Sequence, residues 1–234
     1  MSNTFNVYLK ELRSYFSSPI AYIAVAMFTF LSGFFFFVGS IDQRSPSLEG
    51  PFYNVTIILI FLMPLISMKL ISEEKKSGTL ELLLTRPIKE LDIVLGKYLA
   101  AATLYLVMLL PTISYSVILF LLSKPDLYPL LSQYGAIYLV GLAFIALGLF
   151  ASSLTENQVV AAVFAFTFIL VLWLLNWLTS SLGPDNPIGY FAVSNHFSDL
   201  VKGVIDLRDV VFYLSFIVFW IYLTTRVLDA KRWV

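Results

Sequence analysis

Residues 134–154 read YGAIYLVGLAFIALGLFASSL, an apolar run without a charged side chain. A helix rises about 1.5 Å per residue, so a run of this length can cross the roughly 30 Å hydrocarbon layer of a bilayer. Five further apolar runs occur along the chain: 19–40, 52–68, 99–122, 159–179 and 210–228. These runs are continuous rather than alternating, which favours helices over the strands of a membrane barrel. The sequence therefore predicts an all-α integral membrane protein with six transmembrane helices.

The composition of the whole chain agrees with this class. Of its 234 residues, 59% are apolar and 13% are charged, and the mean hydropathy is +0.86. Fifteen Lys plus Arg balance fifteen Asp plus Glu, so the chain has no basic excess with which to hold a nucleic acid. No ionisable side chain lies in the interior of a run, which argues against a proton-coupled transporter.

The sequence contains few residues of the types that carry out catalysis or bind metal ions. The chain has no cysteine, which excludes disulfides, thiolate nucleophiles and Cys-type metal sites. Its single histidine, His196, is interpreted as an ordinary polar residue near the outer surface rather than as a metal ligand. No metalloprotease, hydrolase or phosphate-binding-loop motif occurs. We therefore expect no catalytic, cofactor-binding or metal-binding residue in this chain, which is not expected to be an enzyme.

Positive charges predict the orientation, because Lys and Arg close to a span resist translocation. With the N-terminus inside, eleven of the fifteen face the cytoplasm: Lys10, Arg13, Lys69, Lys75, Lys76, Arg86, Lys89, Lys97, Arg226, Lys231 and Arg232. Six is an even number, so both termini are expected to be cytoplasmic. Residues 1–18 carry their aromatic and leucine side chains on one side, which predicts an amphipathic interfacial helix on the inner membrane surface.

The predicted cytoplasmic loop 69–97 is dense in both charge and leucine. Residues 79–85 are expected to form about two helical turns that Pro87 ends. Three leucines share one face of this helix: Leu80, Leu83 and Leu84. The spacing alone supports two interpretations equally, a helix that docks against a cytoplasmic protein and a surface helix that stabilises a hairpin.

Residues 73–87, EEKKSGTLELLLTRP, resemble the E-E-[KR]-x-x-G-T-[LI]-E-L-L-L-[TS]-x-P signature of ABC-2 type permeases. In that family the signature lies between the second and third spans and includes the coupling helix that inserts into the nucleotide-binding subunit. Four further segments, 17–20, 94–97, 151–158 and 203–210, resemble the gliding-motility-associated permeases of the GldF type. The resemblance covers nearly the whole chain.

The resemblance implies that residues 1–234 form a single ABC-2 type transmembrane domain, the permease subunit of an ATP-driven exporter in the bacterial plasma membrane. ATP and Mg²⁺ would be bound by a separate ABC ATP-binding subunit. A second permease half, identical or homologous, would complete the path, and a GldG-like accessory subunit is a further expected partner. The alternative is a membrane scaffold that uses an associated ATPase to hold or extract proteins without transport.

The resemblance also implies which residues contact the ATPase. Three leucines, Leu80, Leu83 and Leu84, would be apolar anchors, with Gly78 forming the turn that aims their helix. The polar rim and the flanks would consist of Glu73, Glu74, Lys75, Lys76, Thr79, Glu81, Arg86 and Pro87. The helix at residues 1–18 is expected to touch the same partner through Lys10, Glu11 and Arg13.

Overall fold

The computed structural model describes residues 3–42, 47–84, 88–123, 125–180 and 187–232, and every regular element in these ranges is helical. The α-helices are α1 (Asn3–Ser17), α2 (Pro19–Phe36), α3 (Glu49–Ser67), α4 (Lys69–Lys76), α5 (Thr79–Leu84), α6 (Glu90–Leu109), α7 (Ile113–Leu122), α8 (Leu127–Leu154), α9 (Gln158–Ser180), α10 (Val193–Val201) and α11 (Leu207–Arg232). Shorter π- and 3₁₀-helical turns occupy Phe37–Asp42, Leu110–Thr112 and Pro187–Phe191. Six helical stretches of the described residues are long and apolar enough to cross a membrane, which confirms the predicted all-α membrane class.

The third span differs from its prediction at its start. It was expected from residue 99, but α6 already begins at Glu90, so residues 90–97 of the expected loop are helical. Glu90 and Asp92 in the first turn favour a helix start here, because carboxylates complement the partial positive charge of a helix N-terminus. The span continues through a 3₁₀ turn at Pro111, which has no backbone N–H to donate, into α7.

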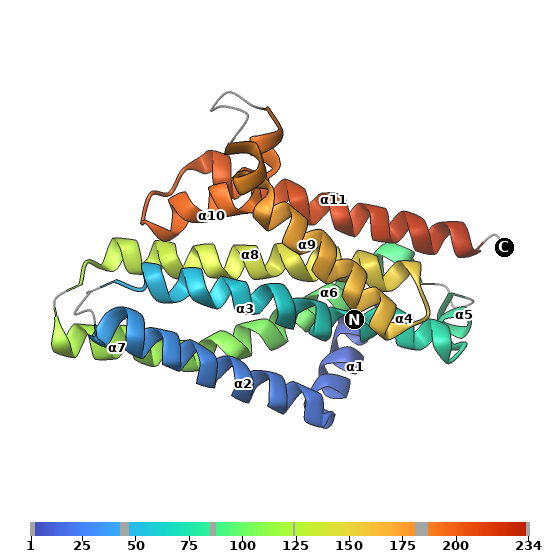
Figure 1. Cartoon of the computed structure of the whole chain (residues 1–234). Helices are drawn as coiled ribbons and strands as arrows, with labels where there is room; N and C mark the ends of the chain where they lie inside the picture. The colour runs from blue at the N-terminus through green and yellow to red at the C-terminus, as the bar shows by residue number, and fades with distance from the viewer. Residues whose placement is uncertain (1–2, 43–46, 85–87, 124, 181–186, 233–234) are drawn as a thin grey trace.

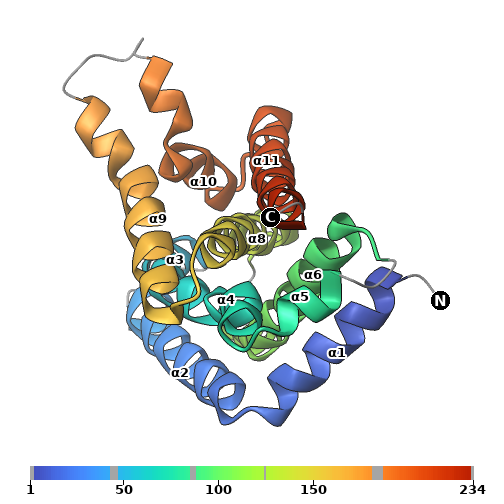
Figure 2. The ribbon, with the colours of Figure 1, turned by 90° about the vertical axis from the view of Figure 1, so that its right-hand side faces the viewer.

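The centre of the bundle is α8, which lies among α3, α4, α6, α9 and α11 (Figure 2). Small residues let its neighbours approach closely. A Cβ atom added to Gly148 would lie 1.9 Å from Ser67 Oγ of α3, and one added to Gly141 would lie 2.2 Å from the Tyr105 ring of α6. These glycines of the fourth span thus serve tight packing inside one chain.

Both described ends of the chain lie at the same end of the bundle, together with α4 and α5 (Figure 1). We call this the inner end, because the distribution of Lys and Arg predicts that it faces the cytoplasm. The helix α10 lies near the opposite end of α11 (Figure 1). It ends at Val201, and Gly203 just beyond it adopts a positive φ of 93°, a left-handed conformation that is common after a helix C-terminus.

Candidate functional site

The signature segment folds into a bent pair of helices, α4 and α5, which we call the elbow (residues 69–84). Gly78 stands between them with φ 67°, a left-handed conformation that suits glycine. The Ser77 N–H donates to Glu73 O (3.0 Å) and the Gly78 N–H donates to Lys75 O (3.1 Å), which closes the end of α4. The turn expected at Gly78 is therefore present in the structure.

The exposed side chains that the structure describes on the elbow are polar. Glu73, Lys76, Thr79 and Glu81 are exposed. Leu80 is only 4% exposed and belongs to the core of this chain. Its expected role as an anchor in a groove of a partner does not fit this conformation, because its side chain already packs inside the protein.

The remaining expected anchors and flanks are described unevenly. Leu83 is half-buried and packs against the core of the chain, which helps to hold the elbow against the bundle. The side chain of Leu84 is not among those described, and Arg86 and Pro87 lie outside the described residues.

Four charged side chains, Lys10, Glu11, Glu74 and Lys97, form what we call the four-charge cluster. Lys97 Nζ lies 2.9 Å from Glu11 Oε1 and 2.9 Å from Glu74 Oε2, the latter an ion pair by distance without hydrogen-bond alignment. Lys10 Nζ lies 2.7 Å from Glu74 Oε1 and 3.6 Å from Glu11 Oε1. Two cations and two carboxylates thus balance one another and join α1, α4 and α6.

The ion pairs of the four-charge cluster are needed because one of its charges, that of Lys97, is buried. The Lys97 side chain is 1% exposed and lies about two turns into α6, where an unpaired ammonium would be strongly disfavoured. Burial lowers the pKa of Lys10, but the hydrogen bond and charge of Glu74, together with Glu11, outweigh this and raise that pKa above its usual value. Lys10, Glu11 and Glu74 were predicted as contacts of a partner; in this structure they bind one another and Lys97.

The helix α1 is packed along α6. A Cβ atom on Gly96 would lie 2.8 Å from Val7 Cβ, so glycine is what permits the two backbones to approach. Thr4 Oγ1 donates to Asp92 Oδ1 (2.6 Å), which adds a second tie between these helices. Segment 94–97 therefore holds two contacts of α1, the close approach at Gly96 and the ion pair at Lys97.

The elbow is also attached to the central helix. Ser152 Oγ of α8 accepts hydrogen bonds from the N–H groups of Ile71 and Ser72 (3.0 Å each) and donates to Met68 O (2.7 Å). Lys75 Nζ donates to Ser153 O, and the Lys75 side chain is turned to α8 rather than to the rim predicted for it. Segment 151–158 thus holds α4 where it continues α3.

Most of the predicted interface residues that the structure describes are exposed: Lys10, Arg13, Glu73, Lys76, Gly78, Thr79 and Glu81. Lys10 also pairs with Glu74. Glu11, Glu74, Lys75 and Leu80 make contacts within the chain and are less accessible.

Sequence reasoning missed Lys97 and Ser152 as site residues. Both lie in segments that carried the family resemblance, which was the available signal.

Charged and polar contacts join the helices at the inner end. Among the described residues there is no group of three or more His, Cys, Asp or Glu side chains that could hold a metal ion. His196, at the other end, contacts Asp209 Oδ1 through Nδ1 (2.6 Å) and Tyr190 O through Nε2 (2.9 Å), and is buried. The elbow is thus attached at its start to α8 through Ser152, and Glu73, Lys76, Thr79 and Glu81 are exposed on it.

In the comparison with known families, a family described as ABC-2 family transporter protein matches residues 5–232, nearly the whole chain. No curated protein matches it.

Proposed function

The chain belongs to the ABC-2 family of transporter membrane proteins, and on that premise we propose that it is the permease of an exporter that a separate ABC ATP-binding subunit drives through the elbow. The observation that carries this proposal is the attachment of the elbow to three transmembrane helices. The elbow continues α3, contacts α6 through the four-charge cluster and contacts α8 through Ser152.

The tip of the elbow supplies the docking surface. Exposed charges of both signs, Glu73, Lys76 and Glu81, suit a partner surface with complementary charges, which sets orientation and register. Thr79 and Gly78 place a backbone turn between these charges, where a partner can approach closely. Leu80 and Leu83 stabilise this surface from inside.

Movement of the tip has a defined route into the membrane. Since Glu74 of α4 pairs with Lys10 of α1 and Lys97 of α6, and α4 is hydrogen-bonded to Ser152 of α8, a displacement of α4 would shift these helices with it. When ATP binding changes the arrangement of the partner subunits, different contacts with the elbow in the two states would favour two arrangements of the spans.

The assembly follows from the family and the charges. The partner subunit binds ATP and Mg²⁺, and a second permease half, identical or homologous, completes the path. The distribution of Lys and Arg supports cytoplasmic termini, and the family resemblance supports a bacterial plasma membrane. The resemblance of four segments to GldF-type permeases supports a role in gliding motility with a GldG-like accessory subunit.

Charge reversal at the tip tests the proposal. Glu73→Lys, in the chain co-purified with its ATPase, is expected to abolish permease-stimulated ATP hydrolysis, because it reverses a charge on the proposed docking surface. The Glu73 side chain is exposed, so the fold is expected to stay intact. Lys202→Glu is the matched control, since Lys202 is an exposed charge near α10. Normal stimulation by Glu73→Lys, with unchanged thermal unfolding, would contradict the proposal. Stimulated hydrolysis without ATP-dependent cargo movement in vesicles would support the scaffold alternative.

A further inference from the structure

His196 lies at the outer end of the molecule, on α10, which lies near the start of α11 (Figure 1). Its side chain is only 7% exposed. Nδ1 lies 2.6 Å from Asp209 Oδ1 of α11, and Nε2 lies 2.9 Å from the backbone oxygen of Tyr190 in the 3₁₀ turn Pro187–Phe191. One imidazole ring therefore contacts two other elements, each time through an oxygen atom.

The two oxygen partners determine how many protons this site holds. A backbone carbonyl oxygen and an ionised carboxylate accept hydrogen bonds and donate none. A neutral imidazole has one N–H, so one of its nitrogens would turn a lone pair toward an oxygen atom at 2.6 or 2.9 Å. An imidazolium donates from both nitrogens and satisfies both contacts. The geometry thus requires one proton more than a neutral ring beside a carboxylate would hold.

The surroundings of Asp209 place this proton on the ring. Asp209 lies in the first turn of α11, where the partial positive charge of a helix N-terminus favours a carboxylate. The side chain is buried, and its Oδ2 has no hydrogen-bond partner among the described residues. A buried carboxylate that is so poorly solvated is strongly disfavoured unless its neighbour carries the opposite charge. The imidazolium of His196 supplies that charge.

An aromatic ring also favours the charged form of His196. The Phe212 ring is stacked on the imidazole, with centroids 3.9 Å apart and planes 19° apart. The face of an aromatic ring carries partial negative charge, which attracts a cation placed over it. The ring of Tyr190 meets the imidazole at 87°, with centroids 5.1 Å apart, and helps to bury it.

The other titratable and charged groups around this pair lie further from the imidazole nitrogens. Arg208 of α11 is exposed and lies over the Tyr190 ring, and Asp199 of α10 itself is exposed. Tyr213 of α11 donates through its hydroxyl to Val193 O (3.0 Å). The contacts of α3, α8 and α9 with α10 involve uncharged groups: Tyr53 and Trp173 at the Phe197 ring, and Ser132 at Leu200 O. Asp209 is therefore the charged group in direct contact with His196.

We propose that His196, Asp209 and the backbone oxygen of Tyr190 form a proton-dependent clasp, which fastens the turn Pro187–Phe191 to α10 and α11 and loosens as the pH on the outer side rises. Loss of the second proton to water leaves a neutral ring that can donate to one oxygen. It keeps the stronger bond to the carboxylate of Asp209, so its contact with Tyr190 O becomes repulsive. The turn then loses an attachment. This clasp does not depend on the ATPase partner.

The protonation of the ring can be measured without interference from other histidines. His196 is the single histidine of the sequence, so ¹⁵N-labelled histidine reports this ring alone when the full chain is purified with a histidine-free tag. NMR spectra are recorded in mild detergent at about pH 6 and about pH 9, because histidine changes its charge near neutral pH. We expect two protonated ring nitrogens at the lower pH and one at the higher pH.

Amide hydrogen exchange on the same samples measures the turn. The Ala192 N–H donates to Gly189 O (3.2 Å) and the Asn195 N–H donates to Ala192 O (3.1 Å), so these amides report the end of the turn and the start of α10. Their protection, relative to the intrinsic exchange rate at each pH, should be at least about tenfold lower at the higher pH, because a charge-assisted hydrogen bond is lost.

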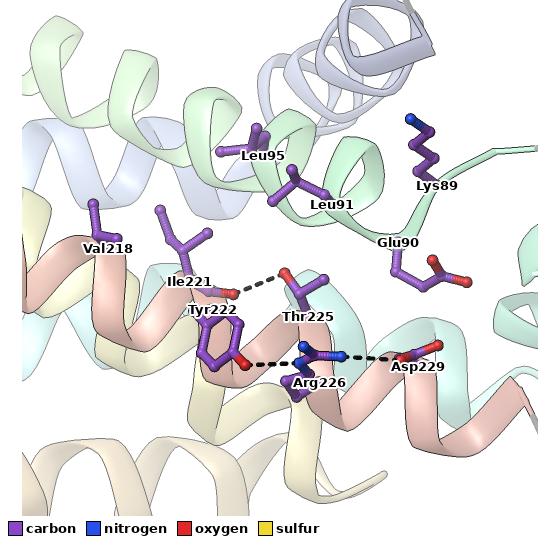
Figure 3. A pocket seen from close by; sticks show the side chains of 10 residues that line it. All are labelled: Lys89, Glu90, Leu91, Leu95, Val218, Ile221, Tyr222, Thr225, Arg226 and Asp229. Atoms are coloured by element: carbon purple, nitrogen blue, oxygen red, sulfur yellow. Dashed lines mark hydrogen bonds and ion pairs between the residues drawn. The ribbon is translucent and has the colours of Figure 1, made fainter.

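The other half of α11 supplies an internal control. Residues 218–225 of this helix border a groove that faces the start of α6, and they contain no histidine (Figure 3). Their protection is expected to be the same at both pH values, so a loss confined to the outer end distinguishes opening of the clasp from unfolding of the whole chain.

Three variants identify the groups involved. His196→Gln cannot take up a proton, so its Ala192 and Asn195 amides should show equal protection at both pH values. Asp209→Asn removes the carboxylate, and its ring should show one unprotonated nitrogen already at the lower pH. Asp199→Asn is the matched control, because Asp199 is an exposed carboxylate of the same helix as His196, and it should behave like the unmodified chain.

Four results would overturn the proposal. A neutral ring at the lower pH would contradict the proton count, and an imidazolium that persists at the higher pH would exclude a switch. Equal protection of the Ala192 and Asn195 amides at both pH values in the unmodified chain would show that the proton does not hold the turn. The same pH-dependent loss of protection in His196→Gln would assign the effect to another group.

Discussion

Replacing the buried ammonium of the four-charge cluster gives the sharpest test of how the elbow is held. Lys97→Met keeps the unbranched stem and removes the charge, so Glu11 and Glu74 lose the cation that lies 2.9 Å from each of them. Breaking a buried ion pair by removing one partner costs about 3–5 kcal/mol. Lys10 remains near both carboxylates, so we expect the lower limit, a loss of about 3 kcal/mol in the free energy of unfolding.

The assay is thermal unfolding of the purified chain in one detergent. For a chain of this size, 1 kcal/mol corresponds to about 2–4 °C, so the Tm should fall by about 6–12 °C. Lys76→Met is the control, because Lys76 is exposed on the same helix as Glu74, and its Tm should change by less than about 2 °C.

A second replacement separates the ion pairs from packing. Lys97→Met combined with Glu11→Gln leaves one carboxylate, Glu74, for the one remaining cation, Lys10. The double variant should therefore be more stable than the sum of the single losses by about 1 kcal/mol or more. Strictly additive losses, or a Lys97→Met variant that unfolds within 2 °C of the unmodified chain, would refute the account of the cluster.

Three further changes test the packing and the turn of the elbow. Gly148→Ala should destabilise the chain by about 1–3 kcal/mol in thermal unfolding, because its Cβ would meet Ser67 Oγ at 1.9 Å, whereas Gly135→Ala, with nothing within 4 Å, should be neutral; equal effects would contradict the packing. Gly78→Ala should lower stimulated ATP hydrolysis and cost about 1–2 kcal/mol of stability, since its φ is 67°, and unchanged hydrolysis and Tm would remove the turn from the mechanism. Ser152→Ala should cost about 1–3 kcal/mol and expose the start of the elbow to faster amide hydrogen exchange, because three hydrogen bonds are lost; unaltered exchange would show that α8 does not hold the elbow.

The membrane class and the six spans could be predicted because hydropathy acts locally. A continuous apolar run of about twenty residues has few alternatives to a transmembrane helix. The start of α6 was missed because Lys97 looked like a loop residue by its charge, and only carboxylates from α1 and α4, far away in the sequence, make its burial favourable.

The elbow shows what local patterns leave undecided. The spacing of Leu80, Leu83 and Leu84 correctly indicated a helix, and Leu80 and Leu83 share a face toward the core, but spacing alone does not say what covers such a face. In the structure the chain's own core covers Leu80, and the described exposed side chains of the elbow are polar. Likewise, charge alone made Glu73 and Glu74 look alike, whereas Glu73 is exposed and Glu74 is held by Lys10 and Lys97.

Site-specific photo-crosslinking in native membranes tests the central claim most directly. A photoreactive residue is placed at Thr79 or Lys76, both exposed on the elbow, and at Lys202 as the control. We expect adducts between the elbow positions and an ABC ATP-binding subunit, with a yield that changes between nucleotide-free and ATP-bound membranes, and none from position 202. Adducts from both elbow positions that contain only lipid or the chain itself, in membranes where ATP-driven transport proceeds, would contradict the account.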